Sequence, residues 1–454
     1  MGTISFFVPD PLPPDRRAAA ESVCLSGGYD LTPVPTRRKL SPGRIDLTRD
    51  GSESGYLQVA WPADGLPAGT VTLSSTLRER AEPYHLALEL ARGRVNRLRC
   101  QLAEWTAIGM DVPADEAAEL RAVTRRFGEL VRDPTAPVAD ALAGEVLARA
   151  HHLADALTRA FAEQLLLTRL GGGRLPTKLA AKLTAAPAGA ERERLSGLLT
   201  AVRVVPDWAA IEPTESAYEW DALDAAVGWA TAAGLPLSLG PILDLAGGRY
   251  PAWLAAWAGD LPSLAAFTCD FVETVVRRYQ GRVAAWLPVG GFNQADALGL
   301  AEDDRIRLAA RLLESASRTD PTAELVLSVA QPWGDYLCED AYTYTPLVFA
   351  DTLVRAGFHF AALDLELLSG PPPAGSRRRD GLEVFRLFEQ FAVLGIPLEL
   401  TTGNGDWTEA AAGLAVALPQ FRQVTWANDD PTAGPLRPDG LFQRLRASVV
   451  AGPG

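Results

Sequence analysis

The chain has 454 residues, of which 48% are hydrophobic and 22% are charged. This is the composition of a globular protein and excludes a mainly disordered chain. The formal net charge of −13 argues against nucleic acid or an anionic membrane surface as the main partner. The most apolar window, residues 225–245, is interrupted by glycine and proline and does not predict a membrane span.

The cysteines, the histidines and the N-terminus predict no disulfide framework, no metal site and no signal peptide. The four cysteines form no CxxC pair, so we expect reduced thiols rather than a disulfide framework. The four histidines show no metal-ligand spacing, so we expect neither a metal site nor a cofactor. The N-terminus lacks a basic region followed by a long apolar run, which predicts no signal peptide and a cytoplasmic protein.

Residues 1–82 are rich in turns and short alternating runs. Residues 55–61 and 69–74 alternate between apolar and polar side chains, with proline and glycine between them. This pattern predicts a small antiparallel, sandwich-like β unit. Tyr56 or Trp61 could stack on a sugar, as in a carbohydrate-binding module, or could simply fill the core of the unit.

Residues 83–172 change to a helical pattern. Apolar residues recur at helical spacing up to Trp105, and further helical segments run over about 115–132 and 138–170. We expect a helical connector, which is also the place where a protein partner could bind. The pair His151 and His152 has a functional interpretation, but a solvated or half-buried helix position is the simpler one.

Residues 173–454 alternate apolar runs with amphipathic segments. This order predicts a (β/α)8 TIM barrel, so the fold class is α/β with a β unit and a helical connector before the barrel. A doubly wound open sheet would favour a glycine-rich phosphate turn after an early strand, and none is present. The predicted strands are 179–184, 201–206, 236–243, 283–289, 324–330, 360–367, 397–402 and 423–427. The predicted helices include 222–233, 263–279, 305–317, 347–356, 382–394, 409–418 and a closing helix near 441–449.

The ends of these strands indicate the ligand. In a barrel the site lies at the C-terminal ends of the strands, and here these ends are rich in Trp, Asp, Asn and Gln, without Lys or His. Indoles stack on sugar rings and amides bind hydroxyls, so we expect a carbohydrate or another polyhydroxylated ligand, although any one indole could merely fill the barrel mouth. The predicted substrate-binding residues are Asp207, Trp208, Asn293, Gln294, Gln331, Trp333, Trp426 and Asn428. Residues 428–430 could also bind a cation, but turn chemistry explains them more simply.

Several motifs appear in a fixed order. The strongest runs from Arg278 and Tyr279 through Gly281 to Trp286, as RYQGRVAAW. Together they resemble segments of the family 10 glycoside hydrolases, the xylanase family, and this resemblance implies a barrel with a glycan groove at its C-terminal face. The other motifs are Ile211-Glu212-Pro213, Asp320-Pro321, Gly395-Ile396-Pro397, Val424-Thr425-Trp426 and Asp439-Gly440-Leu441-Phe442, so that the resemblance covers about 201–447.

The sequence departs from that family at its catalytic positions. The resemblance implies a retaining mechanism with one glutamate after the fourth strand and one after the seventh. Here Gly290 and Gly291, or the amide Gln294, stand at the first position, and Thr402 stands at the second. Strand alternation turns Glu399 to the opposite face from Thr402. The usual catalytic pair is therefore absent from the aligned positions.

Another pair of carboxylates could take over. Asp364 and Glu366 lie two residues apart on the predicted sixth strand and share a face, and Asp244 or Asp207 could be their partner. The candidate catalytic residues are thus Glu366, Asp364 and Asp244, unless the pair only binds ligand hydroxyls or an arginine. Three hypotheses follow: a divergent glycosidase with relocated carboxylates, a catalytically inactive carbohydrate-binding relative, and a structural or interaction protein on a barrel scaffold.

Overall fold

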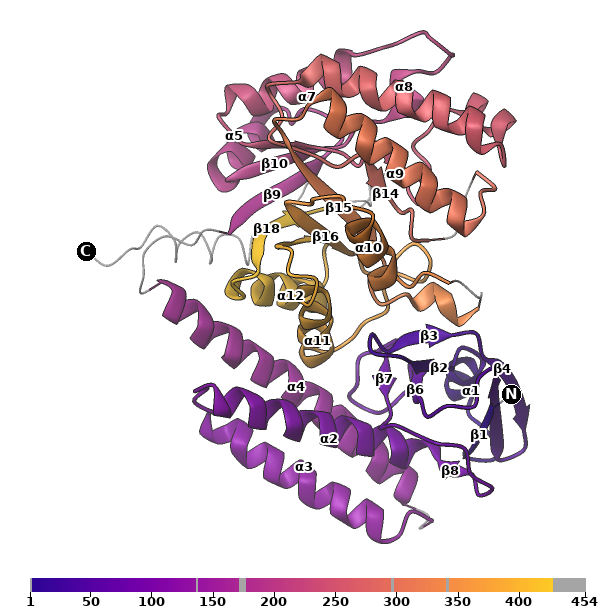
Figure 1. The fold of residues 1–454 in the computed structure, drawn as a ribbon. Coiled ribbons are helices and arrows are strands. Elements are labelled where there is room, and N and C mark those ends of the chain that lie inside the picture. Colours follow the sequence, from indigo (N-terminus) through magenta and orange to yellow (C-terminus); the bar gives the residue numbers. More distant parts are fainter. Residues whose placement is uncertain (1, 136–137, 171–176, 295–297, 340–342, 428–454) are drawn as a thin grey trace. The chain divides into compact units, whose positions relative to one another are not determined.

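The computed structural model describes residues 2–135, 138–170, 177–294, 298–339 and 343–427 (Figure 1). The chain divides into two compact units. The first contains residues 1–167 together with 333–342 and 377–388, and the second contains the remainder from residue 168 onward. The domain boundaries that the sequence predicts at residues 82 and 172 stay a prediction.

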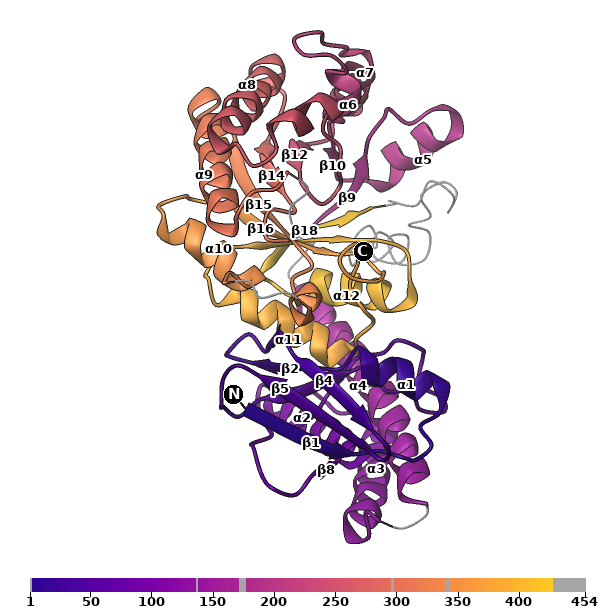
Figure 2. The ribbon, with the colours of Figure 1, turned by 90° about the vertical axis from the view of Figure 1, so that its right-hand side faces the viewer.

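The first unit begins with two small sheets, which confirm the predicted antiparallel β unit. Three strands of one sheet lie side by side in Figure 2, and the short β8 adds to them in parallel. Trp61 is only 2% exposed, so it lies in the core of the unit. One sheet has the order β4 (Arg37–Ser41), β5 (Arg44–Arg49), β1 (Gly2–Phe7) and β8 (Tyr84–His85), and the other β3 (Thr32–Val34), β2 (Cys24–Gly27), β6 (Tyr56–Val59) and β7 (Thr72–Leu73), with the helix α1 (Pro14–Glu21) between β1 and β2.

Three long helices follow in the same unit, where the sequence predicts them: α2 (Leu86–Ala107), α3 (Ala114–Arg132) and α4 (Ala139–Leu170). Two later segments join this unit, one with the short helix η2 (Asp335–Cys338) and one with α11 (Gly381–Ala392) as far as Phe388. The indole of Trp105 stacks on Phe161, with centroids 4.3 Å apart, and meets Phe385 edge-on. This aromatic cluster packs α2, α4 and α11 together.

A buried ionic cluster lies beside these rings. His151 is 2% exposed, and its ring nitrogens lie 2.5 Å from Asp380 Oδ2 and 2.8 Å from Thr72 Oγ1. The expectation of a solvated or half-buried histidine is therefore wrong for His151, because the long-range partner Asp380 compensates for its burial. Arg94 Nη1 lies 2.9 Å from Asp380 and 3.2 Å from Glu383 and supplies a cation to the cluster.

The second unit is a closed barrel of eight parallel strands, which confirms the predicted fold class. β9 pairs with β10 and also with β18, so an open doubly wound sheet is excluded. In barrel order the strands are β10 (Ala201–Val204), β11 (Leu237–Leu239), β13 (Ala285–Trp286), β15 (Glu324–Ala330), β16 (Ala362–Leu367), β17 (Leu398–Thr402), β18 (Phe421–Trp426) and β9 (Lys178–Leu183).

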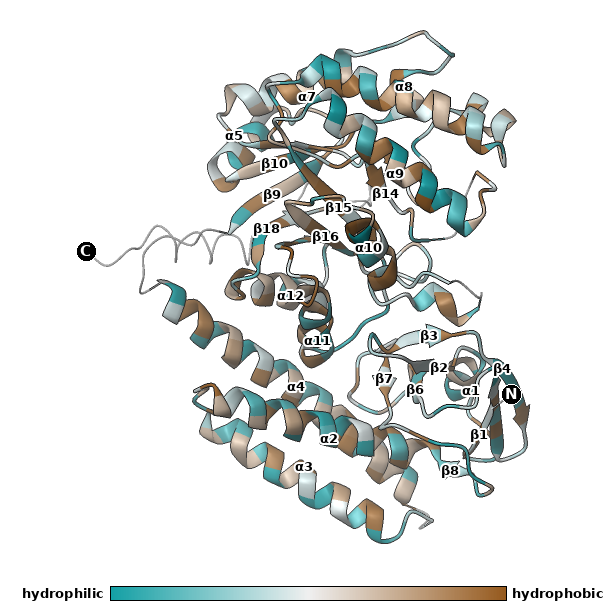
Figure 3. Ribbon diagram, viewed as in Figure 1, coloured by the Kyte–Doolittle hydropathy of each residue, from teal (hydrophilic) through white to brown (hydrophobic). Residues whose placement is uncertain are grey.

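The predicted crossover helices are present as well. In Figure 3 the strands β15 and β16 are mostly hydrophobic, whereas the helix α9 alternates between polar and apolar residues, as expected for an element with one face on a core. Among the described residues, none of the helices combines the length and apolarity that a bilayer crossing requires. The helices are α5 (Gly189–Leu198), α6 (Trp208–Ile211), α7 (Asp221–Ala232), η1 (Ala252–Trp257), α8 (Leu261–Tyr279), α9 (Glu302–Thr319), α10 (Pro346–Arg355), α11 and α12 (Asp406–Ala417); the closing helix predicted near 441–449 lies outside the described residues.

The barrel strands β11 and β13 are interrupted. Each is followed by a two-residue strand, β12 (Leu243–Asp244) and β14 (Val289–Gly290), and these pair in parallel as a separate small sheet. Pro241 and Pro288 stand at the interruptions. Proline has no backbone N–H and therefore cannot donate a hydrogen bond to a neighbouring strand. The extension carries Asp244 beyond the barrel strands to their C-terminal side.

The residues of the RYQGRVAAW motif make packing contacts with α7 and with the segment before β15. Tyr279 donates a hydrogen bond of 2.9 Å from its hydroxyl to Asp224 of α7, and Arg278 Nε donates to the same carboxylate. Trp286 donates from its indole nitrogen to Asp320, at 3.1 Å. The motif residues therefore join α8, α7 and the entry to β15, which explains their spacing without assigning them to a site.

Candidate functional site

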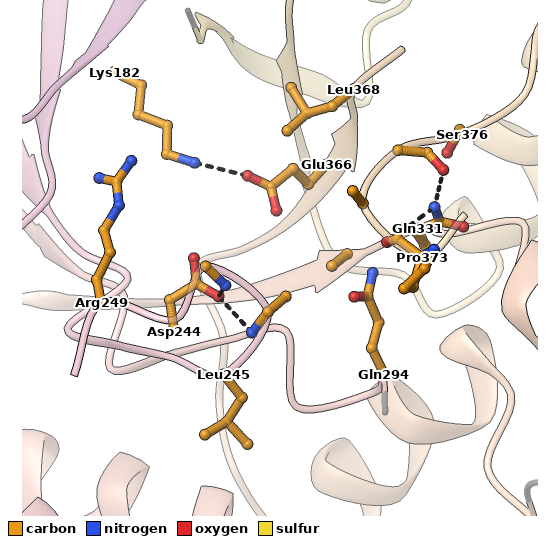
Figure 4. Close-up of a pocket in the computed structure, with 15 residues that line it drawn as sticks. Lys182, Asp244, Leu245, Arg249, Gln294, Gln331, Glu366, Leu368, Pro373 and Ser376 are labelled. Carbon is orange, nitrogen blue, oxygen red and sulfur yellow. Dashed lines mark hydrogen bonds and ion pairs between the residues drawn. The ribbon is translucent and has the colours of Figure 1, made fainter. Parts of the chain in front are cut away.

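A cavity of about 540 Å³ lies at the C-terminal ends of the barrel strands (Figure 4). Its polar lining comes from strand ends and from the loops that follow β12 and β16. Of the residues predicted from the sequence, it contains Glu366, Asp244, Gln294 and Gln331. It also contains Lys182, Arg249 and Ser376, which were not among them, and its remaining lining residues are Leu245, Ala246, Gly247, Ala330, Leu368, Pro373, Ala374 and Gly375.

Lys182 and Glu366 form an ion pair in this cavity. The Nζ atom of Lys182 lies 2.8 Å from Oε1 of Glu366. Burial alone would raise the pKa of Glu366, but the Lys182 ammonium, with further help from Arg203 and Arg249, lowers it below its ordinary value. The expectation that the strand ends carry no lysine is therefore wrong. The sequence feature that could have indicated this lysine is its position as the single charged residue inside the predicted strand 179–184.

Asp244 is the second cavity carboxylate. Its Oδ1 accepts backbone hydrogen bonds from Ala246, at 3.1 Å, and from Gly247, at 2.9 Å. These bonds from the loop after β12 hold the carboxylate in place at the end of the strand. Burial, followed by the negative charge of Glu366, raises the pKa of Asp244, against the opposing effect of the Gly247 N–H. The two cavity carboxylates therefore differ in their readiness to hold a proton.

Asp364, the third predicted carboxylate, does not line the cavity. It lies below Glu366 on β16, is 1% exposed, and its Oδ2 is 2.5 Å from Nη1 of Arg203. Arg203 also lies 2.6 Å from Glu399 and donates to Thr401. Asp364 thus belongs to a buried ionic network inside the barrel. This is the alternative stated above, in which the carboxylate pairs with an arginine.

Gln331 stands at the end of β15 and fixes the loop after β16. It has a positive φ of 47°, and its Nε2 donates to the carbonyl oxygens of Pro373 and Gly375. Its Oε1 and the Oγ of Ser376 are buried and have no hydrogen-bond partner among the described residues. Both residues also line the cavity.

The other predicted binding residues lie outside the cavity lining. Trp208 is fully buried and stacks on Phe271 at 4.4 Å, and Trp426 is buried with its indole nitrogen bound to Asn404. Trp333 belongs to the first unit. Among the described residues the cavity lining contains no aromatic side chain, because these indoles are packed inside the protein.

Two of the polar residues that the sequence predicts to bind substrate have structural roles. Asp207 caps α6 by accepting a hydrogen bond from the Ala210 N–H. Asn293 exchanges hydrogen bonds with the backbone of Ala330, donating at 2.7 Å and accepting at 3.2 Å. Asn428 and the rest of the 428–430 cluster lie outside the described residues.

Gly290 and Gly291 stand where the backbone is tightly packed. A Cβ at Gly290 would lie 2.6 Å from Pro241, and one at Gly291 would lie 2.6 Å from Ala246. Thr402 is buried and donates to the backbone of Leu367, and Glu399 is bound by Arg203.

No family model matches this chain. Solved structures similar to it include a GH10 structure from Paenibacillus barcinonensis, 18% identical over 61% of this chain and 89% of that one, with a TM-score of 0.43. Native xylanase 10B from Thermotoga maritima is 13% identical over 63% and 97%, with a TM-score of 0.44. A Thermobacillus composti GH10 xylanase is 16% identical over 61% and 96%, with a TM-score of 0.43.

Proposed function

We propose that the barrel cavity binds a carbohydrate or another polyhydroxylated ligand. The observation that carries this proposal is the convergence of Lys182, Glu366, Asp244, Gln294 and Gln331 on one cavity. Together they offer donors and acceptors, and a sugar hydroxyl is both. The volume of about 540 Å³ is in the range of small-molecule sites.

The charges of the cavity favour a neutral ligand. Two cations, Lys182 and Arg249, face two carboxyl groups, Asp244 and Glu366. A phosphate would meet these carboxyl groups as well as the cations, and like charges at short range disfavour such a ligand. Hydroxyl groups, in contrast, accept from the cations and donate to the carboxylates.

Calorimetric titration with a panel of neutral mono- and disaccharides and of sugar alcohols tests this proposal. We expect saturable binding by the wild type and a loss of about tenfold or more in Glu366→Gln, because hydrogen bonds to a charged group contribute about 1.5–3 kcal/mol. Glu215→Gln is the matched control, since Glu215 is exposed and outside the cavity. An absence of binding by the wild type, or equal affinities for the wild type and Glu366→Gln, would contradict the proposal.

Hydrolysis of a glycosidic bond is the second candidate, and the opposite pKa shifts of Asp244 and Glu366 favour it. Pairs of acidic groups whose pKa values are pushed apart are suited to acid and base roles. Asp244, with its raised pKa, would donate a proton to the leaving oxygen as the glycosidic bond breaks. Glu366, held ionised by Lys182, would attack the anomeric carbon or activate the attacking water.

Release of sugar from a panel of synthetic aryl glycosides distinguishes hydrolysis from binding alone. In a hydrolase, Asp244→Asn and Glu366→Gln would each lower kcat, whereas Asp221→Asn, which changes an exposed aspartate of α7, would leave it unchanged. The Asp244→Asn defect should be smaller for substrates with acidic leaving groups, because these need less protonation. Saturable binding without any sugar release would leave the cavity as a binding site.

A further inference from the structure

We infer that Gln331 and Ser376 form a hydroxyl-recognition subsite for the terminal sugar of a short, neutral saccharide. This inference rests on the proposed carbohydrate function and assigns the substrate class. Figure 4 shows the polarity of the cavity: Lys182, Arg249 and Asp244 lie on one side and Gln331 and Ser376 on the other, with Glu366 between them. The subsite is the uncharged side.

The wall of the subsite is built by the loop at residues 368–376. Within it, Ser376 N donates to Leu368 O at 2.7 Å, Gly375 N to Pro371 O at 2.9 Å and Gly370 N to Ser376 O at 3.2 Å. The Gln331 amide donates to two further carbonyl oxygens of the loop. The loop is therefore held in shape by its own bonds and by Gln331.

Two polar atoms, one of Gln331 and one of this loop, make no hydrogen bond within the part of the chain that the structure describes. Gln331 is 3% exposed and Ser376 is 1% exposed, yet Gln331 Oε1 and Ser376 Oγ have no hydrogen-bond partner among the described residues. Buried polar groups are satisfied in the great majority of cases, and exceptions occur at functional sites. Because both residues line the cavity, a ligand is the partner that their positions suit.

The chemistry of the two atoms defines what they bind. The amide oxygen of Gln331 only accepts, whereas the hydroxyl of Ser376 both donates and accepts. A sugar hydroxyl that donates to Gln331 Oε1 and accepts from Ser376 Oγ would satisfy both. The neighbouring lining residues Pro373, Ala374 and Gly375 carry no charge, so a charged substituent such as a uronate carboxylate would lose its hydration here without compensation.

The dimensions limit the length of the ligand. A cavity of about 540 Å³ matches a ligand of drug size, which corresponds to about one or two sugar rings. The loop at residues 368–376 lies at the uncharged side of the cavity. The class of ligand is therefore a neutral mono- or disaccharide whose last ring faces Gln331 and Ser376.

Ser376→Ala tests the subsite by calorimetric titration with the best-binding sugar of the panel and with each of its monodeoxy analogues. We expect a loss of about threefold to tenfold in affinity for the parent sugar, as for one neutral hydrogen bond. One deoxy analogue should bind the wild type and Ser376→Ala equally, because it lacks the hydroxyl that Ser376 contacts. The same sugar with a uronate in place of its terminal hydroxymethyl group should bind the wild type more weakly.

Stability measurements separate recognition from folding. Ser376 Oγ has no partner to lose, so Ser376→Ala should keep or slightly raise the urea midpoint. Ser328→Ala is the matched control. The Oγ of Ser328 is also buried and unpartnered among the described residues, but Ser328 does not line the cavity. The affinity of Ser328→Ala for the sugar should therefore equal that of the wild type.

The outcomes are distinct. If the wild type binds no sugar, both the proposed function and the subsite are overturned. If it binds a sugar but Ser376→Ala binds the parent and every deoxy analogue as the wild type does, the subsite alone is overturned. Tighter binding of the uronate or of long oligosaccharides would overturn the assigned class of ligand.

Discussion

Lys182 and Glu366 are 184 residues apart in the sequence, yet their charged groups lie 2.8 Å apart in the barrel cavity. The pair has two consequences for the site. It holds Glu366 in its ionised form, and it directs the carboxylate from β16 toward β9. Glu366 is therefore preorganised as an anion, which suits a group that accepts hydrogen bonds from a sugar or faces its anomeric carbon.

Replacing Lys182 should change the pH dependence of the site. Removal of the ammonium in Lys182→Met takes away the main influence that lowers the pKa of Glu366, so this pKa should rise. If the cavity binds a sugar through the ionised Glu366, as we propose, this binding should be lost at a higher pH than in the wild type as the solution is acidified. Titrations over a pH series measure the shift, and Lys178→Met, an exposed lysine of the same strand, should show none.

The buried network around Arg203 should dominate the stability of the barrel. Arg203→Met would leave Asp364 and Glu399 buried without their cation, and breaking such a pair costs about 3–5 kcal/mol. Urea unfolding should show this loss. Arg355→Met is the control, because Arg355 is 80% exposed in its pair with Asp351 and should change the unfolding free energy by less than about 1 kcal/mol. Equal effects of the two variants would contradict the prediction.

The first unit should lose stability in acid through Asp380. Burial opposes its ionisation, but Arg94 and His151 lower its pKa from 3.8 to about 2. The resulting stability, about 2 kcal/mol, is present above the unfolded pKa and is lost as the pH falls through the folded one, between about pH 4 and about pH 2.

Hydrogen exchange of α2 and α4 across this pH range measures the effect. In Asp380→Asn the exchange should be faster at neutral pH, since Arg94 and His151 lose their partner, and should depend less on pH. Asp50→Asn, which changes an aspartate whose side chain is 88% exposed, should behave as the wild type. A wild-type acid dependence that persists in Asp380→Asn would assign it to another group.

Gly291 should tolerate no side chain. It has a φ of +70°, and a Cβ would lie 2.6 Å from the backbone nitrogen and the Cβ of Ala246, in the loop that positions Asp244. Gly281 has a similar φ of +78° but nothing within 4 Å of an added Cβ, so Gly281→Ala measures the cost of the backbone conformation alone, about 1–2 kcal/mol. Gly291→Ala should cost more in urea unfolding and should also weaken sugar binding, whereas Gly281→Ala should leave binding intact.

The sequence by itself determined the barrel and the approximate position of its cavity. The alternation of apolar runs and amphipathic segments is a local property, so the eight strands could be located without knowledge of their neighbours. Glu366, Asp244, Gln294 and Gln331 were found because parallel strands bring their C-terminal ends to one face, a rule that depends only on where each strand ends.

Only the tertiary structure decided which charges meet and which aromatic rings are exposed. Lys182 reaches Glu366, and Arg203 reaches Asp364, because β9 and β10 close the barrel with β18 in one particular register. Trp208 and Trp426 are buried because of what packs around them, which strand alternation does not specify. Burial and ion pairing depend on contacts between segments far apart in the chain, and for this reason the sequence identified the carboxylates but not the cations that set their charge.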